Sequence, residues 1–243
     1  MEALWTIGKT WSCILLILGT IGVMTSDCYV ERRLMKTQPG KLIVVEGIDG
    51  SGKSTVASAL YQRLAEHYEV VATREPGGSS LGIHIRSIVH QQVDALDPKA
   101  EFLLFAADRA EHIRHIIRPA LQAGKIIISD RMADSSVAYQ GFGRGVEIDM
   151  IKEINSWVMD EVQPDLILYI RVDVATAQAR IEQRGETKTS FDKESRDFFQ
   201  RVTDGFDTLF CNCSCTVTID GSQSPEQVLE DAWYQCQKVL ADE

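Results

Sequence analysis

The run from Glu46 to Thr55, EGIDGSGKST, has the residue types and spacing that hold the phosphates of a nucleotide. It matches G-x-x-x-x-G-K-[ST], it follows the apolar run LIVV, and a helical pattern comes after it. Its glycines let backbone N–H groups surround a phosphate, and the N-terminus of the following helix adds partial positive charge. The Lys53 ammonium can reach the β- and γ-phosphates, and the Ser54 hydroxyl can ligate Mg²⁺. The run therefore predicts a nucleoside triphosphate site formed by Gly47, Ile48, Asp49, Gly50, Ser51, Gly52, Lys53, Ser54 and Thr55.

Charged motifs follow the second and third apolar runs, and another lies on a helix between them. They read TREPGG at residues 73–78, SDR at 129–131 and FAADR at 105–109. Arg86, Arg109 and Arg131 lie in or near these motifs, and a planar guanidinium can hold two phosphate oxygens at once. Positive charge in such places lowers the barrier to bringing two polyanions together. Asp130 and Arg131 directly follow an apolar strand, where two charges need partners.

The elements that must position these residues are alternating strands and helices. Continuous apolar runs at 42–45, 70–73, 125–129, 166–172 and 216–219 predict five strands of a parallel sheet covered on both faces. Helices are predicted at 56–68, from Asp97 onward, at 144–160 and from Ser224 onward, and we expect Pro119 to end or kink the second. The alternation predicts a doubly wound α/β fold with its site at the carboxyl ends of the strands.

The composition limits the classes of protein that the chain can be. Its 243 residues are enough for one α/β domain, and the net charge of −10, from 25 basic and 35 acidic residues, argues against nucleic acid as a partner. An acidic chain that binds phosphates must gather its arginines in one cleft. We expect the cysteines at 211, 213, 215 and 236 to be reduced thiols, because zinc sites usually show paired C-x₂₋₄-C units and cytosolic disulfides are rare.

Residues 1–34 differ from the rest of the chain. They include an uncharged stretch from Trp11 to Met24, which is shorter than the ~20 apolar residues that span a bilayer as a helix. A signal or targeting segment, a short membrane anchor, and residues upstream of the true start are the open interpretations. We favour a start at Met35, which predicts an N-terminal extension over 1–34 and a single domain over 35–243. This predicts a cytoplasmic protein with no stable membrane association; an organellar or membrane address through residues 1–34 is the alternative.

The sequence resembles the bacterial-type thymidylate kinases, which transfer the γ-phosphoryl group of ATP to dTMP. The resemblance covers roughly residues 41–240 in unbroken order, and its most specific parts are TREPGG, FAADR and the DR-x₃-SS-x₂-YQG stretch that begins at Asp130. It implies a P-loop kinase fold with a small helical lid at about 180–199, ATP and dTMP as substrates, and Mg²⁺ held at Ser54 and Asp130. It also implies a homodimer, for which no residue pattern gives independent support.

The resemblance also implies roles for individual side chains. Arg86 and Arg109 would hold the phosphate of dTMP, Arg131 would bridge toward the transferred phosphoryl group, and Asp49 would contact the acceptor side. Phe105 would stack on the thymine of dTMP, and Ser136 and Gln140 would bind the base through hydrogen bonds. The ring of Tyr139 would crowd a ribose 2′-hydroxyl.

Two positions depart from the family pattern. An aromatic residue usually follows the Asp-Arg pair, whereas this chain has Met132, from which we expect a changed cleft wall rather than lost activity. Members whose phosphate loop lacks an arginine commonly supply one from the lid, just before a Phe-acid pair, and the matching position here is Ser190. Arg184 is our choice for the catalytic arginine of the lid, with Arg180 or Lys188 as alternatives.

Two other functions stay open on the sequence. A related P-loop nucleotide or deoxynucleoside kinase would use another acceptor, although Phe105, Tyr139 and Gln140 together favour thymine and deoxyribose. A nucleotide-dependent switch would need an N-K-x-D-type stretch that reads guanine, and the sequence contains no such stretch. An arginine set of this kind also has no purpose in a simple switch.

Overall fold

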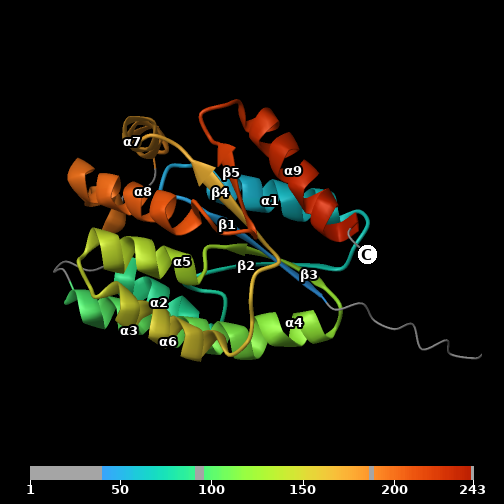
Figure 1. Ribbon diagram of the computed structural model, residues 1–243, viewed down its shortest axis with the longest axis horizontal. Helices are drawn as coiled ribbons and strands as arrows, with labels where there is room; N and C mark the ends of the chain where they lie inside the picture. The colour runs from blue at the N-terminus through green and yellow to red at the C-terminus, as the bar shows by residue number, and fades with distance from the viewer. Residues whose placement is uncertain (1–39, 91–95, 186–188, 242–243) are drawn as a thin grey trace, which may run out of the picture. The chain divides into compact units, whose positions relative to one another are not determined.

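The computed structural model describes residues 40–90, 96–185 and 189–241. The predicted extension over 1–34 and the lid candidate Lys188 lie outside these residues. Within them, five strands form one parallel sheet in the order β2-β3-β1-β4-β5, which confirms the predicted doubly wound fold (Figure 1). The strands are β1 (Lys41–Glu46), β2 (Val70–Arg74), β3 (Ile126–Asp130), β4 (Leu166–Arg171) and β5 (Thr216–Asp220).

The central strand β1 decides where a ligand can bind. It pairs with β3 on one side and β4 on the other, so the strand order reverses there. Ligands of such sheets bind beyond the carboxyl ends of the strands at this reversal. The register pairs Val45 with Asp130, which brings the loop after β1 beside Arg131.

Helices connect the strands, as the alternating pattern predicts. The α-helices are α1 (Lys53–Ala65), α2 (Ser80–His90), α3 (Pro98–His112), α4 (Arg118–Gln122), α5 (Ala133–Ser136), α6 (Ile148–Met159), α7 (Val174–Gln183), α8 (Arg196–Phe210) and α9 (Pro225–Ala241). Wider π-helical turns cover Ile113–Ile117 and Val137–Gly143, and a short 3₁₀ turn covers Phe191–Lys193. Over the described residues, no helix combines the length and apolar character that crossing a membrane would need.

The sheet is buried on both faces, as its continuous apolar strands predict. Along β1 the side chains alternate: Ile43 and Val45 belong to the core under α1 and α9, and Leu42 and Val44 belong to the core on the opposite face. Figure 1 shows α1 and α9 side by side along the sheet. This double cover holds the strand ends rigidly, which is what a positioned site requires.

Two helix predictions differ from the structure in detail. The helix expected from Arg144 begins at Ile148, because Arg144 leaves the π-helical segment and its guanidinium reaches Glu101 and Glu194. Pro119 was expected to end or kink its helix; it does not end it, because helical turns continue to Gln122. The wider turns just before α4 place Pro119 near the start of a new α-helical segment, where its missing N–H is tolerated.

The segment predicted as a lid, about 180–199, is not one uniform charged element. It contains the end of α7, the 3₁₀ turn and the start of α8, and only part of it is exposed. Phe198 and Phe199 are buried in the core, and they begin an apolar stripe that continues through Val202 and Phe206. Because most of this apolar stripe lies after residue 199, the sequence of residues 180–199 alone does not reveal it.

Candidate active site

The loop between β1 and α1 has the backbone that its glycines predict. Gly50 has a φ of +82°, and a Cβ atom there would lie 2.3 Å from the carbonyl oxygen of Ala177 on α7. Only glycine fits such a position. Lys53 is 6% exposed, and its ammonium donates to the Ile48 carbonyl at 3.4 Å and to Asp49 Oδ1 at 3.1 Å. The loop therefore holds its lysine inside the phosphate site.

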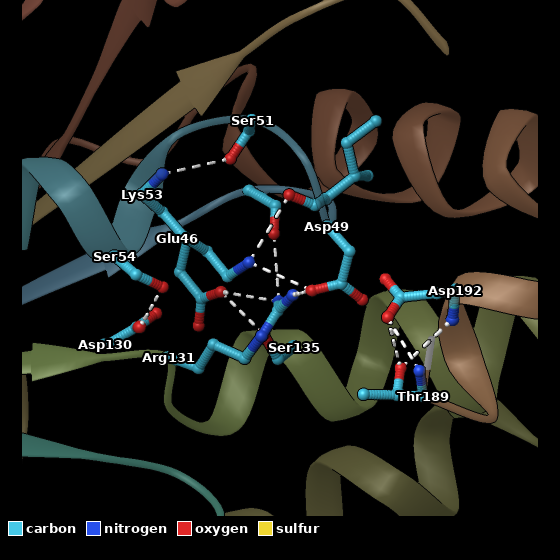
Figure 2. Close-up of polar contacts among 12 residues, drawn as sticks. Glu46, Asp49, Ser51, Lys53, Ser54, Asp130, Arg131, Ser135, Thr189 and Asp192 are labelled. Carbon is cyan, nitrogen blue, oxygen red and sulfur yellow. Dashed lines mark hydrogen bonds and ion pairs between the residues drawn. The ribbon is translucent and has the colours of Figure 1, made fainter. Parts of the chain in front are cut away.

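Arg131 links this loop to the end of β3. Its Nη2 donates to Asp49 Oδ1 at 2.6 Å, and its Nη1 donates to the Gly47 carbonyl at 2.9 Å (Figure 2). The Tyr139 hydroxyl donates to Asp49 Oδ2 at 3.1 Å and accepts from Arg131. Burial disfavours the Asp49 carboxylate, but the charges of Lys53 and Arg131 outweigh it and hold its pKa far below the usual range. Asp49 is thus ionised under all ordinary conditions.

Glu46 supports this arrangement and was not predicted as a site residue. It is fully buried and accepts from the Met132 backbone N–H at 2.8 Å and from the Ser135 hydroxyl at 2.6 Å. Burial raises its pKa to about 7, although the nearby Arg131 opposes the change. The sequence signal for Glu46 was its position at the end of a buried apolar strand, where an acidic side chain needs a partner.

Ser54 and Asp130 bring oxygen atoms together that could hold a magnesium ion. The Ser54 hydroxyl donates to Asp130 Oδ2, and Asp130 Oδ1 is buried without a hydrogen-bond partner among the described residues. Mg²⁺ usually takes one or two protein oxygens and completes its shell with phosphates and water. The Ser54 hydroxyl and the Asp130 carboxylate, with its one unpartnered oxygen, fit that demand.

Arg109 is 1% exposed, and its guanidinium is held by the protein on every side. Nε donates to Glu75 at 2.9 Å, Nη1 to Asn155 at 2.7 Å, and Nη2 to Ser136 at 2.9 Å and to the Met132 carbonyl at 3.4 Å. A guanidinium has five N–H groups, so these bonds leave too few for a two-pronged grip on phosphate. The binding of the dTMP phosphate by Arg109 stays a prediction, with one N–H group left for that contact.

Behind Arg109 lies a buried polar cluster that sequence reasoning missed. Glu75 contacts Arg109 and also His112, whose Nδ1 lies 3.0 Å from Glu75 Oε1. His112 Nε2 lies 2.6 Å from the Thr73 hydroxyl. The charges of Arg109 and His112 outweigh burial and lower the pKa of Glu75. Glu75 therefore ties the turn after β2 to two residues of α3.

Three other predicted acceptor residues line the same cleft as Lys53 and Arg131. Arg86 donates to the Pro76 carbonyl at 3.0 Å; burial, and next the positive charge of Arg74, lower its pKa. Gln140 donates to Glu101 at 2.8 Å, and Phe105 is partly buried with its ring 6.2 Å from that of Phe191. Like charges crowded in a cleft are typical of an anion site.

The candidates for the catalytic arginine of the lid lie in different places. Arg184 lines the cleft, and its Nη2 lies 3.0 Å from Asp192 Oδ2. Thr189 donates to the same oxygen (Figure 2). Ser190 donates to the Val89 carbonyl, so it braces α2. Arg180 lies outside this cleft. It donates to the carbonyls of Ser51 and Gly221 and lines a second cleft on the outer side of the phosphate loop.

The predicted acceptor residues therefore line one cleft together with Asp49, Lys53 and Ser54, whereas Ser51, Gly52, Thr55 and Arg180 line the second. One cleft is lined by five arginines, which confirms that this acidic chain gathers its arginines at one place. They are Arg74, Arg86, Arg109, Arg131 and Arg184. Met132 also lines the cleft, where it is 1% exposed and packs in the core. A changed cleft wall with retained activity stays a prediction.

Comparison with known proteins gives one consistent result. The thymidylate kinase family model matches residues 45–232. The chain is 38% identical to the thymidylate kinase of Halothermothrix orenii over 204 residues, covering 83% of this chain and 98% of that protein. It is 37% identical to the thymidylate kinase of Staphylococcus epidermidis over 199 residues, covering 82% and 98%. The crystal structure of thymidylate kinase from Ehrlichia chaffeensis matches with a TM-score of 0.68 and 35% identity, over 82% of this chain and 99% of that chain. This protein belongs to the thymidylate kinase family.

Proposed function

We propose that this protein phosphorylates dTMP to dTDP with ATP as donor, a step toward dTTP. One observation carries the proposal: the phosphate loop and the predicted acceptor residues line one cleft, joined by the contact between Arg131 and Asp49. A donor site and an acceptor site that share a wall are what direct transfer between two nucleotides requires.

The chemistry needs no strong general base. The phosphate of dTMP has a second pKa near ~6, so it is mostly dianionic at neutral pH and already nucleophilic. The obstacle is repulsion between two polyanions. Lys53 and Arg131 provide fixed positive charge at the seam.

The acceptor pocket supports specific contacts with dTMP. Arg86 is assigned to its phosphate, Phe105 to stacking on thymine, and Tyr139 to the 2′ side of the sugar. Gln140 uses its amide nitrogen on Glu101, which leaves its amide oxygen for the base. Because Arg109 is bound to Ser136 and Glu75, we now assign it a single hydrogen bond to the acceptor, beside Ser136, in place of a two-pronged grip on phosphate.

For the lid, we propose that Arg184 supplies the charge that the phosphate loop lacks. It lines the shared cleft, whereas Arg180 is bound to two backbone carbonyls beside the second cleft. That second cleft, lined by Thr55 and Gln223 among others, is placed to take the base of ATP. Arg184 would move from Asp192 to the phosphates when the lid closes.

We further propose that Mg²⁺ accompanies ATP, held by Ser54 and Asp130. The orphaned Asp130 Oδ1 and the adjacent hydroxyl support this assignment. When bound, the ion would neutralise charge on the β- and γ-phosphate oxygens. A homodimer, a cytoplasmic location and a domain boundary at residue 35 belong to the same proposal and rest on family resemblance and on the favoured start at Met35.

The test is ADP release measured with a panel of monophosphates: dTMP, dUMP, dCMP, dAMP and dGMP. The proposal expects dTMP to give the highest kcat/KM, with dTDP formed in equal amount to ADP. A kinase with another acceptor, the main alternative, would favour a different monophosphate. Hydrolysis of ATP without any phosphorylated acceptor would instead support a nucleotide switch.

A further inference from the structure

The turn between α8 and β5 brings two thiols into contact. Cys213 and Cys215 are separated by Ser214 alone, and their Sγ atoms lie 3.1 Å apart. Both residues are half-buried, so small solutes can reach them. Neither lines the catalytic cleft, and the proposed phosphoryl transfer does not use them.

The backbone holds the two thiols in this position. The Cys213 carbonyl accepts from the Thr216 N–H at 3.1 Å, and the Cys215 carbonyl accepts from the Ile167 N–H of β4 at 2.8 Å. The Cys213 N–H in turn reaches the Phe210 carbonyl at the end of α8. Both ends of the turn are therefore tied to regular structure, and the sulfurs are kept adjacent at little entropic cost.

The two thiols are chemically unequal. Burial opposes ionisation of Cys213, but hydrogen bonds from Thr216 and Cys215 hold its pKa below the ordinary value. Burial raises the pKa of Cys215 to about 11, and its contact with Cys213 adds to the increase. The Thr216 hydroxyl oxygen is buried and has no other partner among the described residues, so its proton is available to the Cys213 thiolate. Cys213 is thus the better nucleophile, with a second thiol beside it.

We propose that Cys213 and Cys215 form a redox modification site that hydrogen peroxide converts to a disulfide. The Cys213 thiolate attacks one peroxide oxygen and the O–O bond breaks, which gives a sulfenic acid and a hydroxide that takes a proton to become water. The Cys215 sulfur then attacks the Cys213 sulfur. The S–S bond forms, the S–O bond breaks, and a second water leaves with the Cys215 proton. Two thiols lose two electrons, and one peroxide becomes two waters.

The remaining described cysteines each lack one requirement. Cys211 is exposed, but its Sγ donates to the Thr208 carbonyl at 3.2 Å. Cys236 is fully buried, and burial raises its pKa to about 12. They therefore serve as internal controls. Cys211 shows how an exposed thiol without a partner sulfur reacts, and Cys236 shows how a thiol that peroxide cannot reach reacts.

The experiment treats the reduced full-length protein with graded hydrogen peroxide, then quenches, denatures, alkylates and maps the peptides by mass spectrometry. We expect the peptide with residues 211–215 to lose two hydrogens and two alkylation sites, reversibly with dithiothreitol, while Cys236 stays fully alkylated. Cys211→Ser should behave like the wild type. Cys215→Ser should stop at a sulfenic acid that dimedone traps, and Cys213→Ser should oxidise at least about tenfold more slowly.

Three results would overturn the proposal. Cys213 and Cys215 could both stay alkylatable at peroxide levels that already oxidise Cys236. The mapped disulfide could join Cys211 to either of them, which would make the exposed thiol the reactive one. Equal oxidation rates for Cys213→Ser and the wild type would show that Cys213 is not the attacking group.

Discussion

Arg131 and Asp49 join the two halves of the cleft, because Arg131 Nη2 lies 2.6 Å from Asp49 Oδ1. Arg131 has a backbone φ of 74°, in the left-handed region that costs energy for any residue with a side chain. Such a conformation persists only where surrounding contacts impose it, and here Asp49, the Gly47 carbonyl and the Ser135 hydroxyl all accept from the guanidinium. In the proposed mechanism, these contacts preorganise the charge that transfer needs.

Arg131→Ala should therefore reduce kcat by about 100-fold or more, the usual cost of losing a preorganised group that stabilises transition-state charge. Steady-state kinetics with dTMP and ATP would measure this, with circular dichroism to confirm the fold. Arg118→Ala is the matched control, since Arg118 pairs with the exposed Asp160 and does not line the cleft. A loss no greater than that of the control would remove Arg131 from the mechanism.

Arg184→Ala and Arg180→Ala should fail in different ways. Arg184 lines the shared cleft, so its loss should lower kcat and leave the KM for dTMP nearly unchanged. Arg180 binds the phosphate loop and the second cleft, so its loss should raise the KM for ATP. If Arg184→Ala keeps its full kcat, the lid charge comes from elsewhere in the chain.

Glu75→Ala should destabilise the fold strongly, because it leaves the buried Arg109 without its carboxylate. Breaking a buried pair in this way typically costs about 3–5 kcal/mol. Glu230→Ala, which removes an exposed pair with Arg63, should cost at most about 1 kcal/mol. Urea unfolding of both variants measures the difference, and similar midpoints would mean that Glu75 does not secure Arg109.

Glu46 should make stability fall as the pH rises. Burial raises its pKa from the ordinary 4.5 to about 7, so the folded protein binds this proton more tightly than the unfolded chain does. The resulting stability is complete below 4.5 and is lost as the pH rises to about 7. Glu46→Gln cannot ionise and still offers an oxygen to the Met132 N–H. Burial also raises the pKa of Asp108, to about 6, so only the difference between the two proteins isolates Glu46.

Urea midpoints at a series of pH values between these limits measure the effect. The variant should show a shallower decline than the wild type. Parallel curves for the two proteins would place the pH dependence on Asp108 or another group.

The strands and the phosphate loop could be predicted from sequence because their signals are local. Continuous apolar runs mark buried parallel strands, and the glycine at position 50 is required by its own backbone and by α7. The cluster of Glu75, His112 and Asn155 could not be predicted, since these residues meet only after α3, α6 and β2 have packed together. The bonds that Arg109 makes inside the protein could not be predicted either, because sequence does not show how many of its donors the protein uses.

The most direct test of the central claim is transfer of label from γ-labelled ATP in an equimolar mixture of dTMP, dUMP, dCMP, dAMP and dGMP. If the cleft is a two-nucleotide site built for thymidylate, nearly all label should appear in dTDP, in equal amount to the ADP formed. Label found mainly in inorganic phosphate, or spread evenly over the diphosphates, would contradict it.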